Sequence, residues 1–114
     1  MLYRHFDPKA LDAAYNNTEA VGQARRDRYV AGWTSRSDVF RARHRGRLDL
    51  CYGGGARQRL DMFSCGAAGA PTVVYIHGGY WQANDKEPYA CLGEGLLPAG
   101  WNLALVQYTL APAA

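Results

Sequence analysis

The stretch that decides the fold is Pro71-Thr72-Val73-Val74-Tyr75-Ile76-His77-Gly78-Gly79-Tyr80-Trp81. Residues 73–76 form an apolar run that does not alternate with polar residues, which predicts a strand buried on both faces. The strand is expected to end at His77, because two adjacent glycines allow a tight turn and leave backbone N–H groups uncovered. Such N–H groups are suited to holding a developing oxyanion. Taken alone, residues 77–81 fit equally well a tight turn whose histidine only hydrogen-bonds the backbone.

The segments around this stretch predict an α/β fold. We expect, in chain order, a strand over 45–52, a turn at 53–55, a strand over 58–63 paired antiparallel to the first, a helix over 86–98 and a strand over 102–110. A strand–helix–strand unit of this length favours a right-handed parallel crossover. The last strand is expected to have an unpaired edge. The glycine turn then lies at the carboxyl edge of the sheet, where α/β proteins bind ligands, and this favours the functional interpretation.

The N-terminal third predicts short helices and contains no catalytic pattern. Asp7-Pro8 is typical of a helix start, with Asp as the N-cap and Pro at the first helical position. A second helix is expected over about residues 20–31, and Ser35 or Ser37 is expected to cap a third short helix. We therefore divide the chain into a helical lead-in, residues 1–42, and a partial α/β domain, residues 43–114.

Composition and charge exclude several classes of function. The 114 residues are 48% hydrophobic and 20% charged, with a net charge of +3, which is typical of one small globular domain. No apolar run approaches the ~18 residues of a membrane span, and the N-terminus is too polar for a secretion signal, so we expect a cytoplasmic protein. Three widely spaced cysteines indicate neither a disulfide framework nor a zinc site. Arginines gather between residues 25 and 47, which is typical of a solvated helix face, and we expect no nucleic-acid partner.

Three segments resemble a known enzyme family. Residues 74–82, Val-Tyr-Ile-His-Gly-Gly-Tyr-Trp-Gln, resemble the oxyanion-hole loop of α/β-hydrolases, in particular the kynurenine formamidase and carboxylesterase branch. Residues 52–63 resemble the opening hairpin of that family, and residues 107–112 resemble its strand ending in Tyr-x-Leu-Ala-Pro. The chain departs from the family at Thr109 and Ala113, where many members carry Arg and Glu. These departures bear on the substrate more than on the fold.

The resemblance implies roles for the residues of the glycine turn. Backbone amides of Gly78, Gly79 and Tyr80 would form part of the oxyanion hole, and His77 would be structural rather than a general base. Tyr80 and Trp81 would line the substrate pocket, and packing under the loop is an equal alternative for both. The resemblance implies no metal and no organic cofactor.

The catalytic triad that the family requires is missing from these 114 residues. A nucleophile in a Gly-x-Ser-x-Gly turn, an acid and a histidine are needed, in that order after the oxyanion loop. None of Ser35, Ser37 and Ser64 has glycines at this spacing, and all histidines lie at or before residue 77. All triad members are therefore expected beyond Ala114.

We therefore predict the N-terminal portion of a serine hydrolase that acts on carboxylic esters or on N-formyl or aryl amides. This portion would supply the oxyanion hole and would be inactive alone. The predicted partners are a small-molecule ester or amide substrate and a second copy in a homodimer, with no nucleic acid and no membrane. The alternative is a non-catalytic binding or interaction module that uses the glycine turn or the open sheet edge.

Overall fold

The computed structural model describes residues 3–113 of the chain. It consists of two compact units, which divide between Gly32 and Trp33. Each unit is described by itself. The predicted domain boundary between residues 42 and 43 stays a prediction.

The N-terminal unit contains α1 (Pro8–Tyr15), α2 (Asn17–Val21) and the first part of α3 (Gln23–Arg43). The predicted start of the first helix is confirmed, because Asp7 is the N-cap of α1 and its carboxylate accepts the Ala10 N–H at 2.8 Å. Asn16 caps α2 in the same way, accepting the Glu19 N–H at 3.0 Å. Each cap satisfies a backbone donor that has no partner inside its helix.

The predicted third helix with a serine cap is wrong, because α3 is continuous over Gln23–Arg43. Ser37 lies inside this helix and is fully buried. Its hydroxyl donates to the Pro88 carbonyl at 2.7 Å and accepts the Cys91 N–H at 2.9 Å. A serine whose hydroxyl binds a neighbouring element does not compete for its own helix backbone, so the helix continues through it.

The second unit is built on a four-stranded mixed sheet, which confirms the α/β fold class. Its strands are β1 (Arg47–Cys51), β2 (Arg59–Phe63), β3 (Thr72–Ile76) and β4 (Asn102–Val106). The order across the sheet is β1-β2-β4-β3, with β3 and β4 parallel and the other neighbours antiparallel. The carboxyl ends of β3 and β4 therefore meet at one edge, and the segments that follow them lie together.

The crossover between β3 and β4 is shorter than the helix predicted over residues 86–98. It consists of the 3₁₀ helix η1 (Glu87–Leu92) and the single-turn helix α4 (Gly93–Leu96). Pro88 at the start of η1 and two glycines in α4 oppose a longer regular helix. Within the described residues, no helix combines the length and apolar character needed to cross a membrane.

Two expectations about the strands are wrong. The last strand, β4, is inside the sheet between β2 and β3, so the edge strands of the described sheet are β1 and β3. The side chains of β3 are also not buried on both faces, since Val74 is 58% exposed and Ile76 is 64% exposed. An unalternating apolar run indicates two apolar faces, but it does not determine whether both are covered within the described residues.

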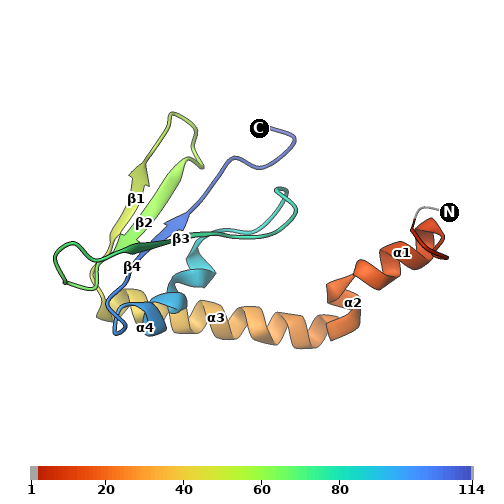
Figure 1. Ribbon diagram of the computed structural model, residues 1–114, viewed down its shortest axis with the longest axis horizontal. Helices are drawn as coiled ribbons and strands as arrows, with labels where there is room; N and C mark the ends of the chain where they lie inside the picture. The colour runs from red at the N-terminus through yellow and green to blue at the C-terminus, as the bar shows by residue number, and fades with distance from the viewer. Residues whose placement is uncertain (1–2, 114) are drawn as a thin grey trace. The chain divides into compact units, whose positions relative to one another are not determined.

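The core lies on the other face of the sheet, where α4 and the C-terminal part of α3 are placed (Figure 1). Its buried residues are Phe40, Phe63, Ala90, Leu103 and Leu105. The rings of Phe40 and Phe63 meet edge to face, with centroids 5.1 Å apart. This packing holds the crossover against the sheet and so places the loop that precedes it.

Two glycines of α4 test how tightly this core is packed. A Cβ at Gly93 would lie 2.2 Å from the ring of Phe40, whereas a Cβ at Gly95 would meet nothing within 4 Å. We expect Gly93→Ala to lower the free energy of unfolding by roughly 1–3 kcal/mol, as overpacked cores do. The matched Gly95→Ala should instead raise it by up to about 1 kcal/mol, because alanine is the better helix former. Denaturant unfolding measures both changes, and equal effects would contradict the described packing.

Candidate active site

The backbone of the glycine turn has an unusual conformation. Three successive residues have positive φ: Gly79 at 127°, Tyr80 at 52° and Trp81 at 57°. Side chains other than glycine rarely adopt such angles, and strained backbone of this kind is concentrated at functional sites. Gly79 is also required sterically, because a Cβ there would lie 2.5 Å from the Ala83 carbonyl oxygen. The turn therefore holds a defined and costly shape.

In this turn, the carbonyl groups accept hydrogen bonds from the protein, whereas the amide N–H groups do not donate to it. The Gly78 carbonyl accepts from the side-chain amide of Asn84 at 2.9 Å, and the Gly79 carbonyl accepts the Gln82 N–H at 3.0 Å. Within residues 3–113, the N–H groups of Gly78, Gly79 and Tyr80 donate to no protein acceptor. Because C=O and N–H point in opposite directions across a trans peptide, the Gly79 and Tyr80 amides face away from the loop interior. They are available to an external acceptor.

His77 lies under the turn rather than in the open. It is 2% exposed, and its ring stacks on Tyr108 with centroids 4.5 Å apart. Its Nε2 lies 3.1 Å from Oε1 of Gln107, and its Nδ1 lies 2.9 Å from the Gly78 carbonyl oxygen. The Tyr108 hydroxyl donates to the His77 carbonyl at 2.7 Å. Both ring nitrogens are thus engaged within the protein, which suits a residue that holds the loop.

Gln107 joins the two ends of the loop, a role that the sequence analysis missed. Besides contacting His77, its Oε1 accepts the Lys86 N–H at 3.0 Å, and its Nε2 donates to Asp85 at 2.7 Å. It is 8% exposed and follows directly after β4. The sequence offered one signal for this role, namely the position of Gln107 directly after a strand. Parallel β3 and β4 bring the residues that follow both strands to one edge of the sheet.

A second anchor comes from the opening hairpin. The Arg57 guanidinium donates to the Tyr108 carbonyl at 2.9 Å, the Asn84 carbonyl at 2.8 Å and the Asp85 carboxylate at 2.9 Å. It therefore ties the hairpin to the segments that follow both β3 and β4. One planar cation can make these three contacts because its donors are held in a fixed fork.

Asp85 is expected to make the stability of the loop depend on pH. The hydrogen bond from Gln107, assisted by Arg57, lowers the pKa of Asp85 below its ordinary value of 3.8. The unfolded chain therefore takes up this proton first as the pH falls. The stabilisation is present above about pH 4 and is lost as the pH falls through the lowered folded-state pKa. We expect the free energy of unfolding, measured with denaturant between pH 6 and pH 3, to depend less on pH in Asp85→Asn than in wild type. A slope for Asp85→Asn equal to that of wild type would contradict this assignment.

A buried lysine lies at the far end of the loop. Lys86 is 3% exposed, and its ammonium contacts Glu87 at 2.7 Å, Asp49 at 2.8 Å and Asp61 at 3.3 Å. Burial alone would lower the pKa of Lys86, but the hydrogen bonds to Asp49 and Glu87 and the charge of Asp61 outweigh it and raise the pKa. Lys86 therefore stays charged and links the loop to β1 and β2.

Tyr80 and Trp81 are exposed, by 77% and 71% respectively. They are therefore not packed under the loop, which was one of the two expectations for them. The Trp81 carbonyl accepts the Ala111 N–H at 2.8 Å, so the segment after β4 also holds the tip of the turn.

Two of the three serines, Ser37 and Ser64, have structural partners. Ser37 connects α3 to η1, as described above, and the Ser64 hydroxyl accepts the Gly66 N–H at 3.0 Å. In the described part of the chain, no hydrogen bond joins a serine to a histidine.

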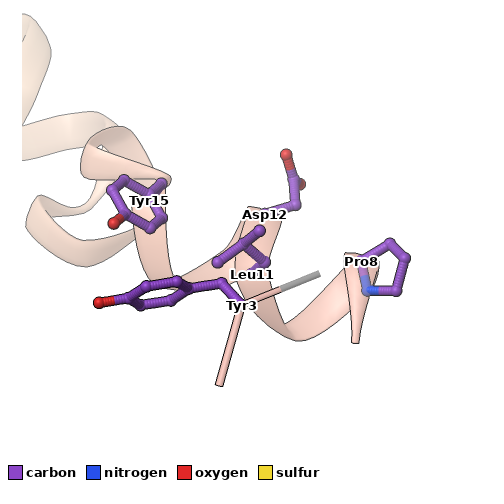
Figure 2. A pocket seen from close by; sticks show the side chains of 5 residues that line it. All are labelled: Tyr3, Pro8, Leu11, Asp12 and Tyr15. Atoms are coloured by element: carbon purple, nitrogen blue, oxygen red, sulfur yellow. The ribbon is translucent and has the colours of Figure 1, made fainter. Parts of the chain in front are cut away.

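A hollow of about 420 Å³ lies in the N-terminal unit, within residues 3–15, and contains neither serine nor cysteine (Figure 2). It is lined by Tyr3, Pro8, Leu11, Asp12 and Tyr15.

Comparison with known proteins places this geometry in context. No family model matches the chain. Over 67 residues it is 34% identical to a kynurenine formamidase of Danio rerio, a match that covers 57% of this chain and 23% of that protein. A kynurenine formamidase of Drosophila melanogaster is 37% identical over 65 residues, covering 55% of this chain and 21% of that protein. The chain thus spans less than a quarter of the length of the curated relatives that it matches.

A solved structure extends this similarity to the fold. A protein of Silicibacter sp. TM1040, described as a candidate thioesterase, is 36% identical with a TM-score of 0.78, and the match covers 91% of this chain and 40% of that one. The chain is thus similar to α/β-hydrolase-like proteins over most of its own length. Esterase B of Lactobacillus rhamnosis is 24% identical, with a TM-score of 0.53. The match covers 86% of this chain and 34% of that one, and the two share a fold.

Proposed function

We propose that this hydrolase-like chain supplies the oxyanion hole of a serine hydrolase through the backbone amides of Gly78, Gly79 and Tyr80. The observation that carries the proposal is that these three N–H groups donate to no acceptor among residues 3–113, although they lie in a strained turn at the carboxyl end of a strand. Backbone amides held in this way can bind an oxyanion without reorganising during the reaction.

In the proposed reaction, a serine hydroxyl attacks the substrate carbonyl carbon and loses its proton to a histidine base. The carbonyl oxygen becomes an oxyanion, and the Gly79 and Tyr80 amides donate to it. The C–O or C–N bond then breaks, the leaving group takes the proton, and water hydrolyses the acyl-enzyme. The 114 residues contain no Gly-x-Ser-x-Gly. We propose that the serine, acid and base belong to a part of the protein outside these residues, so that residues 1–114 alone have no turnover.

The proposed substrates are carboxylic esters and N-formyl amides of aromatic amines. The relatives named kynurenine formamidase and the thioesterase-like structure support hydrolysis at an acyl carbon. The exposed rings of Tyr80 and Trp81, adjoining the proposed oxyanion site, suit an aromatic group by stacking. His77 is proposed to hold the turn and not to act as the base, because its ring is buried and engaged.

The test is to assay the protein that carries these residues with an aryl acetate and with a formanilide. A reactive aryl phosphonate, which traps catalytic serines, identifies the nucleophile by mass spectrometry. We expect turnover of at least one substrate and phosphonylation of a serine other than Ser35, Ser37 and Ser64. Absence of both turnover and labelling would favour a non-catalytic binding module, and labelling of Ser64 would overturn the proposed division of roles.

A further inference from the structure

We infer that Asn84 is a positioning residue that selects the orientation of the Gly78–Gly79 peptide and thereby presents the Gly79 amide. This inference rests on the proposed role of that amide as an oxyanion donor. Asn84 lies at the far end of the same loop, with φ at 76°. Its side-chain amide donates to the Gly78 carbonyl at 2.9 Å.

The need for such a residue follows from the sequence of the turn. The Gly78–Gly79 peptide has glycine on both sides, so neither orientation of its C=O and N–H meets a Cβ. Without a directing hydrogen bond, the peptide could rotate and turn the Gly79 N–H into the loop. The neighbouring Gly79–Tyr80 peptide has its own anchor, because the Gly79 carbonyl accepts the Gln82 N–H at 3.0 Å. The first peptide depends on two side chains, since its carbonyl oxygen lies 2.9 Å both from Asn84 Nδ2 and from Nδ1 of the buried His77 ring, whereas the second is held by backbone.

The surroundings of Asn84 support a directing role. Its backbone carbonyl accepts from Arg57 at 2.8 Å, so the residue is fixed from the opening hairpin. Its Nδ2 also lies 2.9 Å from the position that a Gly79 Cβ would occupy, which shows how closely the side chain approaches the peptide that it binds. Asparagine, aspartate and glycine all tolerate positive φ, so substitutions among them change the donor without adding backbone strain.

Two substitutions of Asn84 separate the loss of its hydrogen-bond donor from changes in side-chain shape and charge. Asn84→Asp keeps the shape but replaces the donor with a carboxylate that repels the Gly78 carbonyl, and Asn84→Gly removes the side chain without adding charge. Ala68→Glu, at an exposed position in the loop that precedes β3, controls for added negative charge. For both Asn84 variants we expect kcat to fall about tenfold or more, approaching the ~100-fold typical of a lost oxyanion donor. KM should change little, because the donor acts on the transition state. Ala68→Glu should stay near wild type.

A spectroscopic measurement tests the positioning without relying on activity. In ¹H–¹⁵N spectra of the same protein, the Gly79 amide resonance should move in both Asn84 variants, while the Tyr80 resonance, whose peptide has the backbone anchor, should move much less. An unmoved Gly79 resonance with unchanged kcat would overturn the inference, even if Gly79→Ala abolishes activity. If Gly79→Ala leaves kcat unchanged while the Gly79 resonance still responds to Asn84, the proposed function fails and the structural role of Asn84 stands.

Discussion

Replacing Gly79 with alanine is expected to lower kcat by about 100-fold or more, the typical cost of a lost oxyanion-hole donor. The new Cβ would lie 2.5 Å from the Ala83 carbonyl oxygen and 2.9 Å from the Asn84 amide nitrogen. It would also occupy a φ of 127°, which alanine rarely adopts. The loop must shift to accommodate it, and the amides of Gly79 and Tyr80 move away from the reacting oxygen. Steady-state kinetics on the preferred ester or formamide measures the loss.

Gly78→Ala is the matched control for this prediction. A Cβ at Gly78 would meet nothing within 4 Å in the described structure, so the turn keeps its shape. We expect the thermal midpoint of both variants to stay close to that of wild type, because the turn is exposed, and only Gly79→Ala to lose most of kcat. Equal kinetic losses in the two variants would show that the conformation at Gly79 is not the decisive feature.

Lys86→Met is expected to lower the free energy of unfolding by about 3–5 kcal/mol, as removal of one partner from a buried ion pair does. The ammonium is 3% exposed and lies between Asp49, Asp61 and Glu87. Methionine keeps much of the side-chain volume but leaves the buried Asp61 carboxylate, which is 2% exposed, without a counter-charge. Urea unfolding, followed by circular dichroism, measures the change.

Two further variants show whether charge or packing causes the loss. The chain has one other lysine, the exposed Lys9, and Lys9→Met should have little effect. Adding Asp61→Asn to Lys86→Met removes the unpaired charge and should recover part of the lost stability, since an amide oxygen can still accept the Asp49 N–H that Asp61 now binds at 2.8 Å. A double variant less stable than Lys86→Met would contradict the electrostatic explanation.

The fold was predictable wherever local chemistry decides the structure. Asp7 and Pro8 mark the start of α1, and the glycine-rich turn at residues 53–55 separates two strands that pair as a hairpin. The sequence of strand, crossover and strand correctly indicated parallel β3 and β4. These signals depend on side-chain periodicity, caps and turn residues, which are local in the sequence.

The incorrect or missing predictions concern residues whose hydrogen-bond partners lie far away in the sequence. Local sequence predicts Ser35 or Ser37 as a helix cap, but the partners of Ser37 follow about 50 residues later, at Pro88 and Cys91. The same holds for the candidate site. The Gly78–Gly79 pair was evident, but the roles of Gln107 and Asn84 depend on the register of β3 and β4 and on the path of the loop. Sequence periodicity does not specify either.

The central claim is that the Gly79 and Tyr80 amides face an external oxyanion. The most direct measurement is a crystal structure of the phosphonate-labelled protein, because the phosphonyl oxygen stands in for the oxyanion of the tetrahedral intermediate. We expect this oxygen to lie about 2.7–3.1 Å from the backbone nitrogens of Gly79 and Tyr80. A phosphonyl oxygen bound by other donors, with these two amides bonded to protein atoms, would contradict the claim.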